Sequence, residues 1–219
     1  RTYTRISIFI AFFAIIAVSL GIEYLIRRTT FSKVVTSACM VAVLIVGIHD
    51  QVPASLVPDY TAIKESFQSD AAFVEQIESC YDKPAMVFQL PYVPFPEGVP
   101  GGYMSDYDHL RGYLHSSDTG WSYGAMKGRY GDYCIKKIAS KPVAEMLSEI
   151  SLCGYDGIYI DSYGYNDAGE SLINSIRDIT GTEPLVSPNN RLFFFNLADY
   201  NEHQKMQYNE NEYNEMKSK

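Results

Sequence analysis

The feature that most constrains this chain is an apolar run of 21 residues near its N-terminal end. Residues 6–26, ISIFIAFFAIIAVSLGIEYLI, contain a single charged side chain, that of Glu23. At a rise of 1.5 Å per residue, a helix of this length crosses the hydrocarbon core of a bilayer, which is about 30 Å thick. The run therefore predicts a membrane-spanning helix.

A second apolar run follows at residues 34–48, VVTSACMVAVLIVGI, which has 15 residues and no charge. A buried core helix is an alternative at this length, and a cleavable signal peptide is an alternative for the first run. Two apolar runs around a short charged turn favour a helical hairpin. We therefore expect residues 1–50 to form a transmembrane hairpin with spans at 6–26 and 34–48.

Charged residues beside the two runs predict the orientation of the hairpin. The connecting loop is basic, with Arg27, Arg28 and Lys33, whereas no Lys or Arg follows the second run before Lys64. Basic residues in short loops stay on the cytoplasmic side. We expect a multi-pass protein of the cell membrane, with the bilayer as a partner and the C-terminal domain outside the cytoplasm, although Arg1 and Arg5 argue for the opposite orientation.

The charge of residues 50–219 limits their partners. This part has 13 Lys and Arg against 25 Asp and Glu, a net charge of −12. Such a domain repels nucleic acid and anionic lipid surfaces. We expect no nucleic-acid partner, and a ligand that is neutral, cationic or bound through a local basic pocket.

Because the chain opens on Arg1 rather than Met, we expect a piece of a longer protein.

Cofactor and metal motifs are absent from the sequence. It has no P-loop, GxGxxG, GxSxG or HExxH pattern, and its cysteines and histidines lack zinc-site spacing. We therefore expect no cofactor and no metal. Cys80, Cys134 and Cys153 allow three single disulfide pairings, between which the sequence does not choose, and buried free thiols are the alternative.

The pattern of residues 60–198 predicts an α/β fold after a proline-bearing linker at 51–59. Apolar periodicity indicates helices at 61–81, 105–116, 131–140, 141–155 and 168–181, and strands at 85–91, 121–126, 156–161 and on both sides of 188–190. Strands joined by a tight turn are antiparallel. We therefore expect a three-layer α/β domain with a mixed sheet ending in an antiparallel hairpin, and a polar mobile tail at 199–219.

A first candidate site lies in residues 106–129, DYDHLRGYLHSSDTGWSYGAMKGR. Trp121 and Tyr123 offer flat faces for sugar rings, and Lys127 and Arg129 offer donors for phosphate or carboxylate groups. Arg111 and His115 complete the predicted substrate-binding set in this segment. The alternative is that the aromatic residues fill the core and the basic residues lie in solvent.

Helical spacing within residues 105–116 makes further predictions. Asp108 and Arg111 are three residues apart, as are Asp106 and His109, so each pair can meet across one turn and form a surface ion pair. His109 and His115 are six apart and do not share a helix face. A two-histidine metal site is therefore disfavoured.

A second candidate site lies at GYDGIYIDSYGY, where the strand at 156–161 ends on Asp161. The carboxyl ends of strands are where α/β domains build their sites, so Asp161 is a candidate catalytic residue and Tyr163 a candidate substrate-binding residue. Glycoside hydrolysis needs a second carboxyl group, and no spacing chooses among the available ones. The alternative is a structural aspartate that caps the following loop.

Taken together, FQLPYVPFPE, DYDHLRGYLHS, WSYGAMKGR, GYDGIYIDSYGY and PLVSPNNRLFFFNL give residues 60–198 a family resemblance. This segment resembles the extracytoplasmic C-terminal domain of bacterial polytopic membrane proteins described as cell-envelope glycosyltransferases or phosphoglycerol-transferase-like proteins. The resemblance implies a transferase with a glycan or lipid-linked sugar substrate, whose catalytic acid lies in an earlier outer loop beyond this chain. The present domain would then bind or orient an acceptor glycan.

Two other functions stay open from the sequence. One is a carbohydrate-active catalytic domain that uses Asp161 in a hydrolase-like reaction. The other is a non-enzymatic interaction module of the cell envelope.

Overall fold

The computed structural model describes residues 2–28, 33–52 and 57–207. The chain divides into two compact units, Arg1–Asp59 and Tyr60–Lys219, and the second is called the C-terminal unit below.

The first unit contains two long helices, α1 (Thr2–Arg28) and α2 (Lys33–Gln51). Their apolar segments, Ile6–Tyr24 and Lys33–Asp50, are 19 and 18 residues long. Both are long and apolar enough to span a membrane, and neither is buried against protein. Glu23 forms an ion pair of 2.5 Å with Arg27 one turn later, which gives the charge within the first apolar run a partner.

The second helix is longer than its apolar run. It begins at Lys33 and extends past Ile48 to Gln51, so that it includes His49 and Asp50. Helical hydrogen bonding continues into polar residues where no proline or glycine stops it. The added turn lengthens the 15-residue run to a helix that can span a membrane.

The C-terminal unit alternates helices and strands. Its elements are α3 (Tyr60–Glu78), β1 (Met86–Leu90), α4 (Leu110–His115), β2 (Gly120–Trp121), α5 (Tyr130–Ala139), α6 (Val143–Leu152), β3 (Gly157–Asp161), the 3-10 helix η1 (Ser162–Gly164), α7 (Glu170–Thr180), β4 (Leu185–Val186), β5 (Leu192–Asn196) and α8 (Ala198–Gln207).

The five strands form one mixed sheet in the order β2-β1-β3-β5-β4. β1 pairs in parallel with β2 and with β3, whereas β5 pairs antiparallel with β3 and with β4. The predicted α/β class with a mixed sheet is thus confirmed. β3 is the central strand, and all five of its residues are buried.

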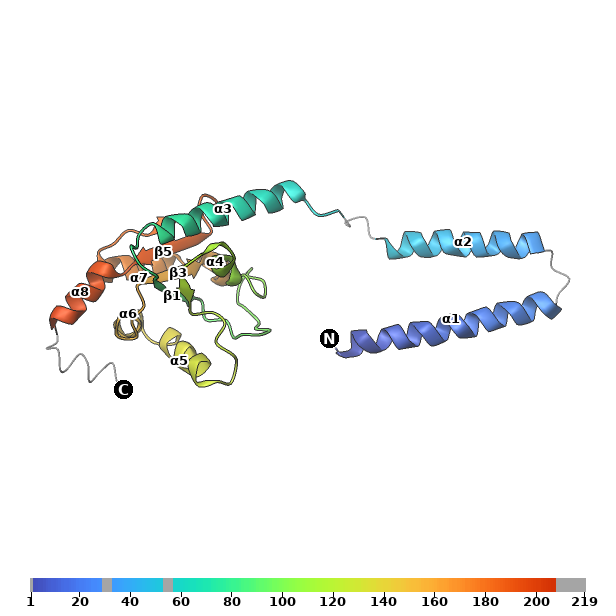
Figure 1. Cartoon of the computed structure of the whole chain (residues 1–219), viewed down its shortest axis with the longest axis horizontal. Coiled ribbons are helices and arrows are strands. Elements are labelled where there is room, and N and C mark those ends of the chain that lie inside the picture. The colour runs from blue at the N-terminus through green and yellow to red at the C-terminus, as the bar shows by residue number, and fades with distance from the viewer. Residues whose placement is uncertain (1, 29–32, 53–56, 208–219) are drawn as a thin grey trace. The chain divides into compact units, whose positions relative to one another are not determined.

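Alternation along β3 directs its side chains to two separate cores. Ile158 and Ile160 belong to one apolar cluster and Tyr159 to the other, as the period of two along a strand requires. The first cluster includes residues of α5, α6 and α7, and the second includes Phe73 and Ile77 of α3. Figure 1 shows α3 on one side of the strands and α5 and α6 on the other.

Two predicted elements are shorter in the structure. The helix expected at 105–116 is limited to α4, because Tyr107 has a φ of 71°, which right-handed helix excludes. The strand expected at 121–126 is limited to β2, which consists of Gly120 and Trp121.

The tail expected to be mobile from residue 199 begins with the helix α8. Tyr200 packs against the core, and the Asn201 side-chain nitrogen donates a 2.9 Å hydrogen bond to the carbonyl oxygen of Tyr155. These contacts order a segment whose composition is polar. Residues 208–219, the rest of the predicted tail, lie outside the described residues.

All four cysteines are free thiols in the structure. Cys80 and Cys153 are exposed and Cys134 is half-buried, so none of the three is the buried free thiol that the sequence left as an alternative.

Candidate functional site

The parallel strands bring candidate residues to one edge of the sheet. β1 and β3 both end at this edge, and the antiparallel β5 begins there, with Leu192 paired to Asp161. Arg191, immediately before β5, is therefore placed beside Asp161. The sheet topology alone creates this ion pair between residues 30 positions apart in the chain.

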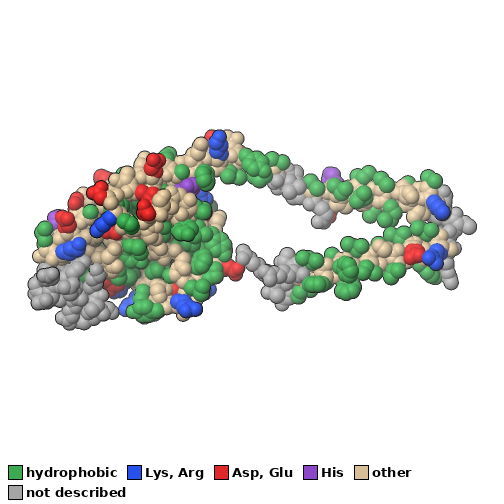
Figure 2. Space-filling view, viewed as in Figure 1, with side chains coloured by type: hydrophobic (Ala, Val, Ile, Leu, Met, Phe, Trp, Pro, Cys, Tyr) green, Lys and Arg blue, Asp and Glu red, His purple; other side chains and the backbone are tan. Residues whose placement is uncertain are grey.

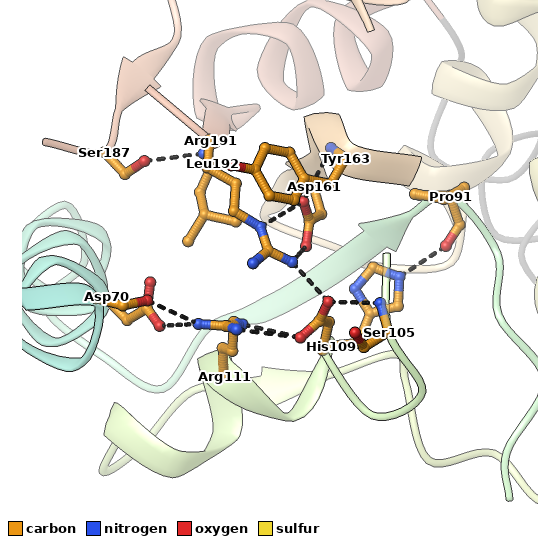
Figure 3. Close-up of polar contacts among 12 residues, drawn as sticks. Asp70, Pro91, Ser105, His109, Arg111, Asp161, Tyr163, Ser187, Arg191 and Leu192 are labelled. Atoms are coloured by element: carbon orange, nitrogen blue, oxygen red, sulfur yellow. Dashed lines mark hydrogen bonds and ion pairs between the residues drawn. The ribbon is translucent and has the colours of Figure 1, made fainter. Parts of the chain in front are cut away.

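Five charged side chains form a continuous chain of alternating sign from this edge to α3 (Figure 3). The order of this charge chain is Asp70, Arg111, Asp108, Arg191 and Asp161. The connecting nitrogen–oxygen distances are 2.6, 3.1, 2.7 and 2.6 Å in the same order. The charge chain links α3, the turn before α4, α4 and the two central strands.

Arg191 is the centre of the charge chain and is only 8 % exposed. Its Nε and Nη2 donate to the two oxygens of Asp161 at 2.9 and 2.6 Å, and Nη2 also donates to Asp108 at 2.7 Å. The guanidinium carbon lies 4.3 Å from the centre of the Tyr163 ring. Burial disfavours the charged guanidinium, but the bonds to Asp161 and Asp108 outweigh it and raise the pKa of Arg191.

Asp161 is fully buried, and both of its oxygens accept hydrogen bonds from Arg191. Its Oδ1 also accepts from the backbone N–H of Tyr163, which caps η1. A carboxylate held in this way positions Arg191 and the loop after β3. It offers no oxygen to a substrate in this arrangement, and its catalytic role remains a prediction.

Asp108 forms the predicted pair with Arg111, and it is held by more than that pair. Its Oδ2 accepts from the backbone N–H of Ser105 at 2.8 Å and from Arg191. Burial raises the pKa of Asp108, but these bonds and the two arginines outweigh burial and lower its pKa. The sequence predicted the helical pair and missed the connection to the sheet edge.

The predicted pairing of His109 with Asp106 is wrong. His109 is 2 % exposed, and its Nε2 lies 2.7 Å from the carbonyl oxygen of Pro91. Because a carbonyl only accepts, Nε2 carries the proton and the neutral ring leaves Nδ1 as an acceptor. Burial lowers the pKa of His109, which keeps the ring neutral.

Trp121 and Tyr123 serve mainly as packing residues. The Trp121 ring lies edge-on to Tyr159 at 5.5 Å, and its Nε1 donates to the Ser116 hydroxyl at 2.8 Å. A Cβ on Gly112 would lie 2.7 Å from the Trp121 ring, so this helix approaches the indole closely. Tyr123 packs its half-buried ring beside His109 and Phe95.

The other predicted binding residues separate into two groups. Arg111 and His115 face a common groove, whereas Lys127 and Arg129 are exposed on the segment before α5. Tyr163 is 46 % exposed and lies against Arg191. The groove that contains Arg111 and His115 includes neither Lys127 nor Arg129 among its lining residues.

The groove that contains Arg111 and His115 lies between α3 and α4 and has a volume of about 500 Å³. It is named the α3–α4 groove here. Its lining residues are Ala62, Ile63, Ser66, Phe67, Asp70, Asp106, Tyr107, Asp108, Arg111, Leu114 and His115.

Both aromatic and charged groups line the α3–α4 groove. The ring centres of Phe67 and His115 are 4.4 Å apart, and the Phe67 residue is 59 % exposed. Arg111 donates to Ser66 at 3.2 Å and to Asp70 at 2.6 Å from the groove wall. An exposed ring beside fixed donors and acceptors is the arrangement that orients a polar ligand with a flat apolar face.

Sequence reasoning missed Arg191 and Asp70. Asp70 is the charged member of the apolar stripe of α3, three residues after Phe67 and four before Val74, and a charge on such a stripe signals a buried partner. Arg191 directly precedes an apolar strand, but only the sheet order shows that it meets Asp161. Within the described residues, no group of three or more His, Cys, Asp or Glu side chains could hold a metal ion.

Comparison with known proteins gives no match. No family model, no curated protein and no solved structure is similar to this chain.

Proposed function

We propose that this chain is the membrane-anchored C-terminal part of a cell-envelope glycan transferase, and that its C-terminal unit binds or orients an acceptor glycan in the α3–α4 groove. α1 and α2 would span the cell membrane as a hairpin, with the C-terminal unit, a three-layer α/β domain, outside the cytoplasm. The catalytic acid would lie in another part of the protein, as the family resemblance of residues 60–198 implies.

The α3–α4 groove is the observation that carries this proposal. Its volume of about 500 Å³ falls within the range of small-molecule sites, which are roughly 300–1,000 Å³. The exposed Phe67 ring offers a face on which a sugar ring can stack, and the exposed side chain of Asp106 offers a partner for hydroxyl groups.

The charges of the groove favour a neutral sugar over one with the phosphate or carboxylate groups for which Lys127 and Arg129 offer donors. Arg111 is shared between Asp70 and Asp108, so its charge is already compensated. Of the three aspartates in the groove, Asp70 and Asp108 are paired with arginines, and Asp106 adds a further negative charge. An anionic ligand would be repelled by Asp106, whereas a sugar hydroxyl can donate to its carboxylate.

Binding of neutral oligosaccharides by the full chain in lipid nanodiscs tests the proposal. Replacing Phe67 with alanine removes the stacking face, and we expect affinity to fall on the order of tenfold. Tyr103→Ala is the matched control, because Tyr103 is an exposed aromatic residue outside the groove. Equal affinity of the Phe67→Ala variant and the parent would refute binding in the groove.

The hydrolase-like alternative depends on Asp161, whose oxygens are occupied by Arg191. It would be favoured if the chain hydrolysed a glycan and Asp161→Asn abolished hydrolysis while the fold was retained. The non-enzymatic alternative would be favoured if no glycan bound and a protein of the envelope did.

A further inference from the structure

Basic side chains are concentrated on one element of an otherwise acidic unit. Of the 13 Lys and Arg in residues 50–219, five lie within residues 127–141, and only one of the 25 Asp and Glu does. That acid, Asp132, is buried and accepts a 2.6 Å hydrogen bond from the Tyr92 hydroxyl. The segment 127–141 is therefore a local positive region, even though the whole unit is negative.

The positive region has a continuous exposed face. Its members, named the α5 patch, are Lys127, Arg129, Tyr130, Tyr133, Lys136 and Lys137. All six side chains are exposed, while Asp132 and Ile138 on the opposite side of α5 are buried. Steps of three and four residues place the exposed members along one side of the helix.

The cations of the α5 patch are available to a partner. None of the four makes an ion pair with a carboxylate in the described ranges, whereas Lys141, the fifth basic residue, pairs with Glu149. Figure 2 shows blue side chains at the lower edge of the C-terminal unit, over α5. By contrast, Arg111 and Arg191 both form ion pairs with aspartates of the charge chain.

Large aromatic and apolar side chains accompany these cations. Tyr130 is 78 % exposed and Tyr133 is 61 % exposed. Met126, just before Lys127, is also exposed, and its backbone bridges to Phe95. Tyrosine with lysine and arginine is the composition of the bilayer–water interface, where rings lie at headgroup level and cationic side chains reach the phosphates.

We propose that the α5 patch docks on the surface of a bilayer that contains anionic lipid. Charge complementarity argues for this partner, since each basic residue near an anionic surface adds to the attraction. An acidic glycan shares the charge, but the α3–α4 groove and the pockets beside Tyr92 and Lys83 include none of the six residues. A set of exposed cations and tyrosines suits the headgroup region of a bilayer.

This inference rests on the proposed membrane anchoring of α1 and α2. Only eight residues, 52–59, separate α2 from α3. A chain extends at most about 3.6 Å per residue, so an anchored C-terminal unit stays close to the bilayer. Such a tether makes docking an intramolecular event, which even a weak patch can accomplish.

Hydrogen–deuterium exchange of the full chain in nanodiscs tests the docking. We expect backbone amides of residues 126–139 to exchange more slowly in discs with about 30 mol % phosphatidylserine than in pure phosphatidylcholine discs. Lys136→Glu with Lys137→Glu should abolish this difference, because each lysine near the surface contributes on the order of fivefold to the docking equilibrium. Lys83→Glu with Lys205→Glu changes the charge equally at exposed positions elsewhere and should leave the difference intact.

The outcomes separate this inference from the proposed function. If the chain resists alkaline extraction from membranes but residues 126–139 exchange equally in both discs, the docking is refuted and the anchoring stands. If alkali extracts the chain, both are refuted. If dextran sulfate protects the α5 patch in neutral discs while anionic lipid does not, the patch binds a soluble polyanion and the membrane assignment is wrong.

Discussion

Replacing Arg191 with methionine removes the cation that Asp161 and Asp108 share. Methionine keeps an unbranched side chain in the space but leaves Asp161, which is fully buried, without its two charge-assisted hydrogen bonds. Breaking a buried ion pair by removing one partner costs about 3–5 kcal/mol. Because a domain of this size is stable by about 5–15 kcal/mol, we expect a loss of about a fifth or more of the free energy of unfolding.

Urea unfolding of the C-terminal unit, expressed as residues 57–219, measures this loss. Trp121 is the only tryptophan and packs on Tyr159 in the core, so its fluorescence reports the unfolding. The double variant Asp161→Asn with Arg191→Met should lose less than the sum of the two single variants, by about 0.5–3 kcal/mol, because it leaves no uncompensated charge at position 161. A loss below about 1 kcal/mol for Arg191→Met, or additive losses in the double variant, would refute the structural role of the charge chain.

Three further predictions concern the same unit. Gly112→Ala should cost about 1–3 kcal/mol and shift the emission of Trp121, because the new Cβ would lie 2.7 Å from the indole; an unchanged urea midpoint would contradict this packing. Burial lowers the pKa of His109, so below about pH 6.5 the unfolded chain binds a proton that the folded chain does not. The free energy of unfolding should therefore fall as the pH drops from about 7.5 to 5.5. His109→Gln should reduce that fall. The lowered pKa of Asp108 contributes stability that is present above its unfolded pKa of about 3.9 and is lost as the pH falls through the folded pKa. Asp108→Asn should therefore lower the free energy of unfolding near neutral pH and make that free energy depend less steeply on pH in acid.

Much of the fold follows from periodicity in the sequence. The apolar run at 6–26 gives α1, and the alternation of GIYID gives the central strand β3 with its two opposed faces. Short elements were less predictable, because local sequence does not decide them. Tyr107 in a left-handed conformation shortens α4, and tertiary contacts of Tyr200 and Asn201 order a polar segment as α8.

The candidate site was only partly predictable for a related reason. The pair of Asp108 and Arg111 follows from helical spacing, and it is present. Arg191 connects this pair to the sheet, and Asp70 connects it to α3. Arg191 is 83 residues from Asp108 in the sequence, and Asp70 is 41 residues from Arg111. Strand order brings these groups together, and a single sequence does not contain that order.

The same contacts change how the aromatic segment 106–129 is interpreted. From the sequence alone, Trp121 is a candidate for stacking on a sugar ring. In the structure, Gly112 and the ring of Tyr159 pack against the Trp121 ring. Phe67 is an apolar residue of the helix predicted at 61–81, and it is exposed in the α3–α4 groove. Amphipathic spacing identifies a face of a helix, whereas only the neighbouring elements determine how much of that face is covered.

Saturation-transfer NMR of the C-terminal unit with soluble, neutral fragments of envelope glycan tests the central claim most directly. Glycan binding in the α3–α4 groove predicts transfer of magnetisation to the ring protons of a sugar, weakened in Phe67→Ala and retained in Tyr103→Ala. No transfer to any fragment, or transfer that is unchanged in Phe67→Ala, would contradict the claim that this unit holds an acceptor glycan in the groove.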